Sequence, residues 1–210
     1  NPLNTQFIAI TPDGNTIIAG NHGATSGGGS AFNTQLFDVS GLPSVSLVSI
    51  IDVSPRNIKV SADGKRLYLA ADDEGLKAFD ISILSSPKFI GATTSLGAVE
   101  DVAFTSDELR AYISVRFEGL KALDITKIRI SDAFSHPITL SISYTSNWPR
   151  RLKLINSENT LVVGFNSGIR LLDVSNKEIP PTQISWINTQ PSDTLSEFRV
   201  SADEIGRAHV

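Results

Sequence analysis

Aspartate recurs at four matched places in this sequence, and repeated carboxylates are a residue type that could assemble a metal-binding ring. The four residues are Asp38, Asp80, Asp124 and Asp173. Each ends an apolar segment and is followed by Ile or Val and then by Ser or Thr. A carboxylate in this setting also accepts hydrogen bonds from turn amides, and such an Asx-type turn explains the whole pattern. We therefore predict a structural turn at each Asp.

A second acidic cluster, Asp72-Asp73-Glu74, could hold Ca²⁺, which prefers clustered oxygen ligands. The cluster lacks the spaced ligand pattern of a calcium-binding loop. No cofactor is therefore predicted, and Ca²⁺ remains the alternative.

The sequence contains few residues that could serve in nucleophilic catalysis. The chain contains no Cys and no Gly-x-Ser-x-Gly segment, and its three histidines are His22, His136 and His209. His22 alone stands among candidate ligand-binding loops, but one His without a located partner is not a catalytic site. The glycine-rich run at 23–30 lacks the Lys of a phosphate-binding loop and precedes a strand, so it is interpreted as a flexible insertion.

These residues are spaced by an internal repeat. A polar turn recurs five times, each time after a short alternating strand, at 11–14, 61–64, 105–108, 155–158 and 201–204. An apolar strand follows each of the first four turns, and a further strand then ends in the repeated Asp, with third-strand segments at 34–40, 76–82, 120–126 and 169–175. Five residues before each Asp stands Asn or Gly, which tolerates the positive φ of a tight hairpin. A loop containing Pro and a fourth strand complete the unit.

One repeat is thus strand, turn, strand, hairpin, strand, loop and strand, without a helical period. A single four-stranded sheet cannot bury both faces alone, so neighbouring sheets must stack, and a β-propeller is the closed solution. The sequence predicts an all-β fold, a partial β-propeller of about four antiparallel blades over residues 1–204. Strands of stacked blades, such as those at 46–51 and 161–163, are expected to be apolar on both sides. An incomplete propeller should also expose an apolar blade flank.

The third strand and its flanks resemble the LVIVD repeat family, which has an apolar strand, Gly-Leu, alternating apolar residues, Asp-Val-Ser and a Pro. The stretch at 61–68 is also similar to the turn of YVTN and lactonase-type propellers. The resemblance implies a propeller on a bacterial or archaeal surface or secreted protein, with no shared catalytic residues. An extracytoplasmic location is the resulting expectation.

Blade geometry places the loops between second and third strands, and those between fourth and first strands, on one shared face. A ligand site is expected there, and these loops bring together Arg and carboxylate side chains. The candidate ligand-binding residues are His22, Arg56, Asp72, Asp73, Glu100, Asp101, Arg116, Arg150 and Arg151. The same residues could instead form a solvated rim of ion pairs, because loops are commonly charged. Trp148 and Trp186 are expected to pack against the blades.

The composition of the chain limits the kinds of partner that this protein is expected to bind. The formal net charge is -4, with 18 Lys and Arg against 22 Asp and Glu, so nucleic acid is not expected as a partner. No apolar stretch is long enough to cross a bilayer. Residues 205–210, Ile-Gly-Arg-Ala-His-Val, do not continue the repeat and are interpreted as a non-native tail, similar to a translated sequencing adapter.

Two functions of different classes follow. The favoured hypothesis is a non-enzymatic surface or secreted module that binds a protein or glycan through its loops, beside further blades or domains of its parent protein. The alternative is a lactonase or hydrolase-like propeller that holds a metal at Glu100 and Asp101. Metal binding at this pair would separate the two.

Overall fold

The structure is a computed structural model that describes residues 5–21, 33–93, 96–125, 138–142, 149–176, 179–188, 199–200 and 208–209. Within these residues the regular structure consists of β-strands, with no α-helix. None of the described segments is therefore a helix long and apolar enough to cross a membrane. The predicted all-β class is confirmed.

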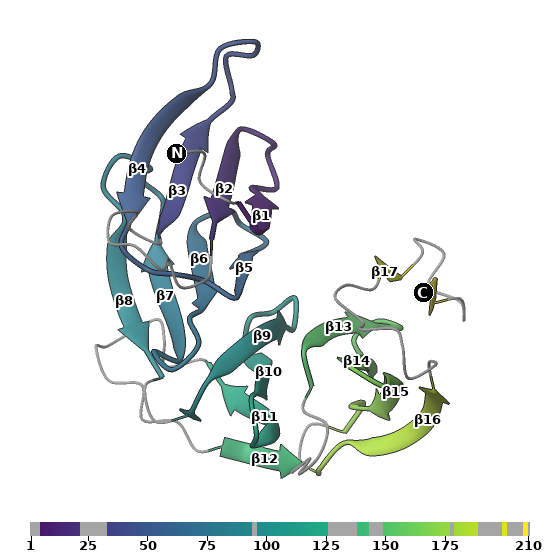
Figure 1. The fold of residues 1–210 in the computed structure, drawn as a ribbon. Coiled ribbons are helices and arrows are strands. Elements are labelled where there is room, and N and C mark those ends of the chain that lie inside the picture. The colour runs from purple at the N-terminus through teal and green to yellow at the C-terminus, as the bar shows by residue number, and fades with distance from the viewer. Residues whose placement is uncertain are drawn as a thin grey trace. The chain divides into compact units, whose positions relative to one another are not determined.

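Sixteen strands of the described residues form four antiparallel sheets of four strands, here called blades 1 to 4 (Figure 1). Blade 1 contains β1 (Phe7–Ile10), β2 (Thr16–Gly20), β3 (Thr34–Asp38) and β4 (Ser46–Ile51). Blade 2 contains β5 (Asn57–Val60), β6 (Arg66–Ala70), β7 (Leu76–Asp80) and β8 (Lys88–Ala92). Blade 3 contains β9 (Val99–Phe104), β10 (Arg110–Val115), β11 (Gly119–Asp124) and β12 (Ile138–Ile142). Blade 4 contains β13 (Arg151–Ile155), β14 (Thr160–Phe165), β15 (Gly168–Asp173) and β16 (Thr182–Asn188).

Each blade is a meander in which every strand pairs with the next along the chain. The four repeated Asp residues occupy one register position, because each ends its third strand and lies opposite the first residue of its second strand. The pairs are Asp38 with Thr16, Asp80 with Arg66, Asp124 with Arg110, and Asp173 with Thr160. The repeat predicted from sequence is therefore the structural repeat.

The chain divides into two compact units, with blades 1 and 2 in the first and blades 3 and 4 in the second. In the first unit, blade 1 residues such as Ile18 and Leu36 pack with Ile58, Leu67 and Leu69 of blade 2. In the second unit, Tyr112 and Leu120 of blade 3 pack with Leu161, Val163 and Phe165 of blade 4. Each internal interface thus joins one face of a blade to one face of the next, as the stacking argument predicts.

The turns after the first strands have a common chemistry in blades 1 to 3. In blade 2, Ser61 Oγ donates to the Asp63 carboxylate at 2.5 Å, and the amide of Arg66 donates to Ser61 Oγ at 2.9 Å. Thr11 with Asp13 and Thr105 with Asp107 repeat these contacts. The fourth residue of each of these turns has a positive φ, at Gly14, Gly64 and Glu108. The blade 4 turn has Ile155 in place of the hydroxyl residue, and its residues Asn156, Ser157 and Glu158 all have positive φ.

One expectation about strand burial is wrong. The strand at 161–163 is buried throughout, as expected, but β4 is mostly exposed, including Leu47 and Ile50. The physical reason is position, since β4 is the last strand of its sheet and has a neighbour on one side only.

The end of the chain also carries structure. A short strand β17 (Arg199–Val200) pairs antiparallel with β18 (Ala208–His209), which lies inside the hexapeptide interpreted as a tail. The turn at 201–204 lies outside the described residues. The foreign origin of residues 205–210 stays a prediction.

Candidate functional site

Blade 2 brings two of the candidate residues together. Arg56 precedes β5 and Asp72 follows β6, so one belongs to a fourth-to-first loop and the other to a second-to-third loop. Arg56 Nη2 lies 2.7 Å from Asp72 Oδ2, and Arg56 Nε donates to the same oxygen at 3.0 Å. The amide of Arg56 also donates to the carbonyl of Ala70. The two kinds of loop therefore meet at one end of this blade, as predicted.

Blade 3 contains a second pair at the same end. Arg116 Nε donates to Glu100 Oε1 at 2.6 Å, and Arg116 Nη2 lies 2.5 Å from that oxygen. The side chain of Glu100 is 5% exposed and that of Arg116 is 22% exposed, so this pair is the more buried of the two. Glu100 also falls at a β-bulge, because Ser114 pairs with Asp101 whereas Val115 pairs with Val99. Bulges commonly redirect side chains beside functional sites.

The placement of Glu100, Asp101 and Arg151 corrects an expectation. The blade pattern of the sequence places them in loops, but Glu100 and Asp101 belong to β9 and Arg151 is the first residue of β13. These strands extend further toward the shared face because their backbones continue pairing with the second strands there.

Asp101 has a structural role that its sequence position does not reveal. Its Oδ1 accepts a hydrogen bond from the amide of Val102 at 2.7 Å. Its Oδ2 accepts one from the amide of Leu152 in blade 4 at 2.8 Å. Because the residue is 1% exposed and engages two amides, Asp101 joins the first strands of blades 3 and 4.

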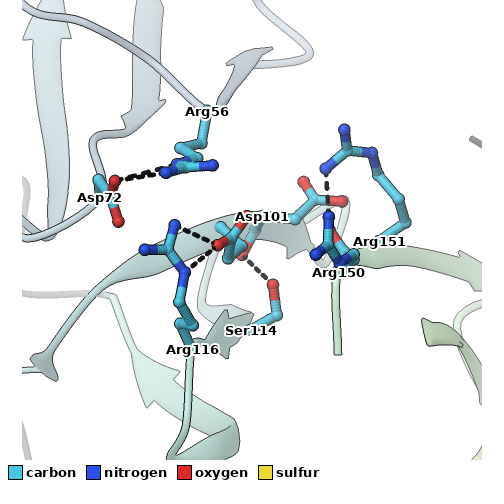
Figure 2. Close-up of polar contacts among 8 residues, drawn as sticks. Arg56, Asp72, Asp101, Ser114, Arg116, Arg150 and Arg151 are labelled. Carbon is cyan, nitrogen blue, oxygen red and sulfur yellow. Dashed lines mark hydrogen bonds and ion pairs between the residues drawn. The ribbon is translucent and has the colours of Figure 1, made fainter. Parts of the chain in front are cut away.

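Arg150 and Arg151 lie next to that link. The amide of Arg150 donates to the carbonyl of Gly164, so Arg150 begins blade 4 in the way that Arg56 begins blade 2. Both side chains are partly buried, and Arg151 Nη1 donates to the carbonyl of Arg150 at 2.9 Å (Figure 2). Asp73 is exposed in its turn. His22, like the run at 23–30, His136 and Trp148, lies outside the described residues.

The acidic cluster at 72–74 is largely neutralised by basic side chains. Asp72 pairs with Arg56, and Glu74 pairs with Lys77. Among the described residues no group of three His, Cys, Asp or Glu is arranged to hold a metal ion. A cation at Glu100 and Asp101 would have to displace Arg116 and two backbone amides, so this arrangement does not fit the metal proposed from the sequence.

The repeated Asp residues make the predicted Asx-type turns wherever the following residues are described. The amides of Ser40, Ser82 and Ser175 donate to Asp38, Asp80 and Asp173 at 2.8, 2.8 and 2.9 Å. The hydroxyl and amide of the same Ser hold the pKa of each of these three carboxyls below its ordinary value. At Asp124 the corresponding residue, Thr126, lies outside the described part of the chain.

Trp186 packs within blade 4. Its ring lies edge-on to Phe165 with centroids 5.9 Å apart, and the Arg170 guanidinium lies 4.8 Å from its centroid. These contacts agree with the packing role expected from the sequence.

Solved protein structures resemble this chain in fold. No protein-family model matches it, and no curated protein matches it. A solved structure from Bacteroides uniformis, provisionally named a 6-phosphogluconolactonase, superposes with a TM-score of 0.66 at 16% identity over 88% of this chain. A second, from Bacteroides fragilis and provisionally given the same name, superposes with a TM-score of 0.59 at 18% identity over 88% of this chain.

The fold is that of a β-propeller. Four-stranded meander blades together with these likenesses decide it. This propeller chain spans 55% of the length of each of the two solved structures.

Sequence reasoning named the partners of both ion pairs but not the pairing itself. The signal was available in the repeat, because Arg56 and Glu100 each stand five residues before the turn hydroxyl, Ser61 or Thr105. Their partners, Asp72 and Arg116, each stand eleven residues after that hydroxyl. Alignment on the turns would have placed opposite charges together in both blades.

Proposed function

We propose that the protein containing this chain is a propeller hydrolase that opens a sugar lactone, with Glu100 and Arg116 at its reacting centre. The observation that carries the proposal is the structural likeness to two propellers provisionally named 6-phosphogluconolactonases. Their printed names supply the substrate class, a phosphorylated sugar lactone.

The chemistry needs a base and a cation. Water attacks the lactone carbonyl and the ring C–O bond breaks, which gives a carboxylic acid and a hydroxyl group, and the acid then releases a proton to become a carboxylate. In this proposal the Glu100 carboxylate takes the proton from the attacking water and returns it to the leaving ring oxygen. Arg116, which binds Glu100 Oε1, orients the carboxylate and offers positive charge to the oxyanion that forms.

The local structure supports these roles in two ways. The bulge in β9 sets Glu100 apart from the regular ladder, and its side chain is almost fully buried, where electrostatic effects are strong. Arg150 begins the neighbouring blade 4 and provides a second cation for an anionic substrate group.

The test is hydrolysis of 6-phosphogluconolactone, followed as acid release, with unphosphorylated gluconolactone as the comparison. We expect Glu100→Gln to lower kcat/KM by about 100-fold or more, as for loss of a general base. Glu74→Gln is the matched control, since it also converts a carboxylate to an amide but lies in an exposed turn, paired with Lys77.

If the Glu100–Arg116 ion pair were purely structural, its variants would lose activity only because the protein unfolds. A further variant therefore separates a structural role from a catalytic one. Glu100→Arg combined with Arg116→Glu keeps both charges but exchanges their positions. The proposal predicts a folded protein without activity. Activity restored in that double variant, or absent from the unaltered protein, would contradict it.

The non-enzymatic interaction module remains the second candidate. Its specific support is that the charged residues at this end of blades 2 and 3 pair with one another, Arg56 with Asp72 and Arg116 with Glu100. A protein or glycan ligand and a surface or secreted location belong to this second proposal. It would gain support if the unaltered, folded protein hydrolysed neither lactone.

A further inference from the structure

One face of blade 1 is apolar and uncovered. It carries Ile8 and Ile10 on β1, Ile17 on β2 and Phe37 on β3, which the strand register places side by side. Ile8 is 69% exposed and Ile10 is 56% exposed. The opposite face of the same blade, with Ile18 and Leu36, is buried against blade 2.

The repeat shows what normally covers such a face. Counted from the turn hydroxyl, the blade 2 counterparts of Ile8 and Ile17 are Ile58 and Leu67; counted from the repeated Asp, the counterpart of Phe37 is Phe79. These three residues are 4%, 0% and 8% exposed, and they pack against blade 1. The equivalent face of blade 2 therefore packs against the blade that precedes it.

Blade 4 repeats the observation in the second unit. There the counterparts are Leu152, Leu161 and Leu172, which are 4%, 0% and 1% exposed and pack against blade 3. In both units, then, the equivalents of Ile8 are covered by one kind of surface, the opposite face of another blade.

The exposure of a residue on the fourth strand does not show whether that face of the blade is covered. Leu47 of β4 is 50% exposed, but its blade 2 counterpart Phe89 is 55% exposed even though that blade face is covered. On the first strand, by contrast, Ile8 is 69% exposed whereas its counterparts Ile58 and Leu152 are each 4% exposed.

We propose that the uncovered face of blade 1 is a docking surface for another four-stranded blade of the same protein. The occupant presents its opposite face, with aliphatic residues at the positions of Ile18 and Leu36 in blade 1 and of Leu120 in blade 3. The solved propellers that resemble this chain are longer, since it covers 55% of their length, and this difference leaves room for such a blade. A second copy of the chain is the competing occupant.

The chain contains no Cys, so a single introduced thiol reports on this face without background. We would place Cys at Ile8 and measure its reaction with a thiol reagent in the 210-residue chain and in the complete protein. Ile58→Cys is the buried control at the equivalent position, and Ser85→Cys is the exposed control. Slow reaction of the thiol in Ile58→Cys also shows that the blades are folded.

We expect Ile8→Cys to react like Ser85→Cys in the 210-residue chain. In the complete protein its reaction should slow by about tenfold or more, because a thiol under a docked blade reacts only through local opening. This protection should not depend on protein concentration.

Three outcomes would overturn the proposal. The first is an equally fast reaction in both proteins, and the second is protection that grows with concentration, which would indicate a second copy. The third is concentration-independent protection already present in the 210-residue chain, which would mean that its own residues cover the face.

Discussion

Arg56 and Glu100 occupy the same position in successive repeats but carry opposite charges. Each binds a residue sixteen positions further along, Asp72 in one case and Arg116 in the other, so the ion pair is retained while its polarity is reversed. Blades 2 and 3 therefore accept a pair of opposite charges at this place in either order. Blade 4 has Arg150 and Asn166 at the equivalent positions.

Exchanging the charges of the blade 3 pair should restore most of the stability that either single change removes. Glu100→Arg or Arg116→Glu alone should lower the free energy of unfolding by about 3 kcal/mol, because each leaves like charges together in a buried setting. Urea denaturation of both single variants and the double variant measures the coupling. Additive losses in the double variant would contradict the prediction.

The link through Asp101 should depend on its second carboxylate oxygen. In Asp101→Asn the side-chain NH₂ group would face the Leu152 amide, so one of two buried hydrogen bonds is lost. We expect a loss of about 1 to 3 kcal/mol, measured by urea denaturation. Slowed exchange at the Leu152 amide should disappear in the variant, and unchanged exchange there would show that the hydrogen bond is unimportant.

Gly75 should tolerate Ala much less well than Gly14, although both have positive φ. A Cβ on Gly75 would lie 2.1 Å from the Thr93 carbonyl oxygen, whereas a Cβ on Gly14 would meet nothing within 4 Å. Gly14→Ala should cost about 1 kcal/mol from backbone conformation alone. Gly75→Ala should cost clearly more, because the Thr93 backbone must also shift. Thermal denaturation compares the two, and equal midpoints would refute the steric argument.

The Asx-type turn at Asp80 should contribute stability that depends on pH. Hydrogen bonds from the hydroxyl and amide of Ser82 lower the pKa of Asp80 in the folded state from its ordinary 3.8. The contribution is therefore complete above that ordinary value and is lost as the pH falls through the lower folded pKa. Asp80→Asn should be less stable near neutral pH by less than about 1 kcal/mol, since the site is exposed.

The measurement is the difference in unfolding free energy between the unaltered chain and Asp80→Asn from pH 7 downward. We expect the difference to shrink below 3.8. A difference that is constant across this range would show that the ionised carboxylate contributes nothing. Asp73→Asn, in an exposed turn, provides a matched control.

The sequence by itself determined the blades of this protein. Period, turn residues and the Asp at each third strand predicted four-stranded meanders, because local hydrogen bonds such as Ser82 to Asp80 depend on residues two positions apart. It also determined that the loops carrying Arg56 and Asp72 share one end of a blade, since strand direction alternates through a meander.

Tertiary structure alone decided that Asp101 is held by an amide of the next blade, whereas the spacing of Glu100 and Arg116 in the repeat matches that of the blade 2 pair. Glu100 and Asp101 are neighbours in sequence, but one binds Arg116 and the other binds the amide of Leu152 in the next blade. The contact between Asp101 and Leu152 depends on how two sheets stack, which no residue type at a fixed spacing encodes. The exposure of Ile8 likewise depends on packing between blades. Ile8 and the buried Ile58 are the same residue type at the same position of the repeat, so the local sequence does not distinguish them.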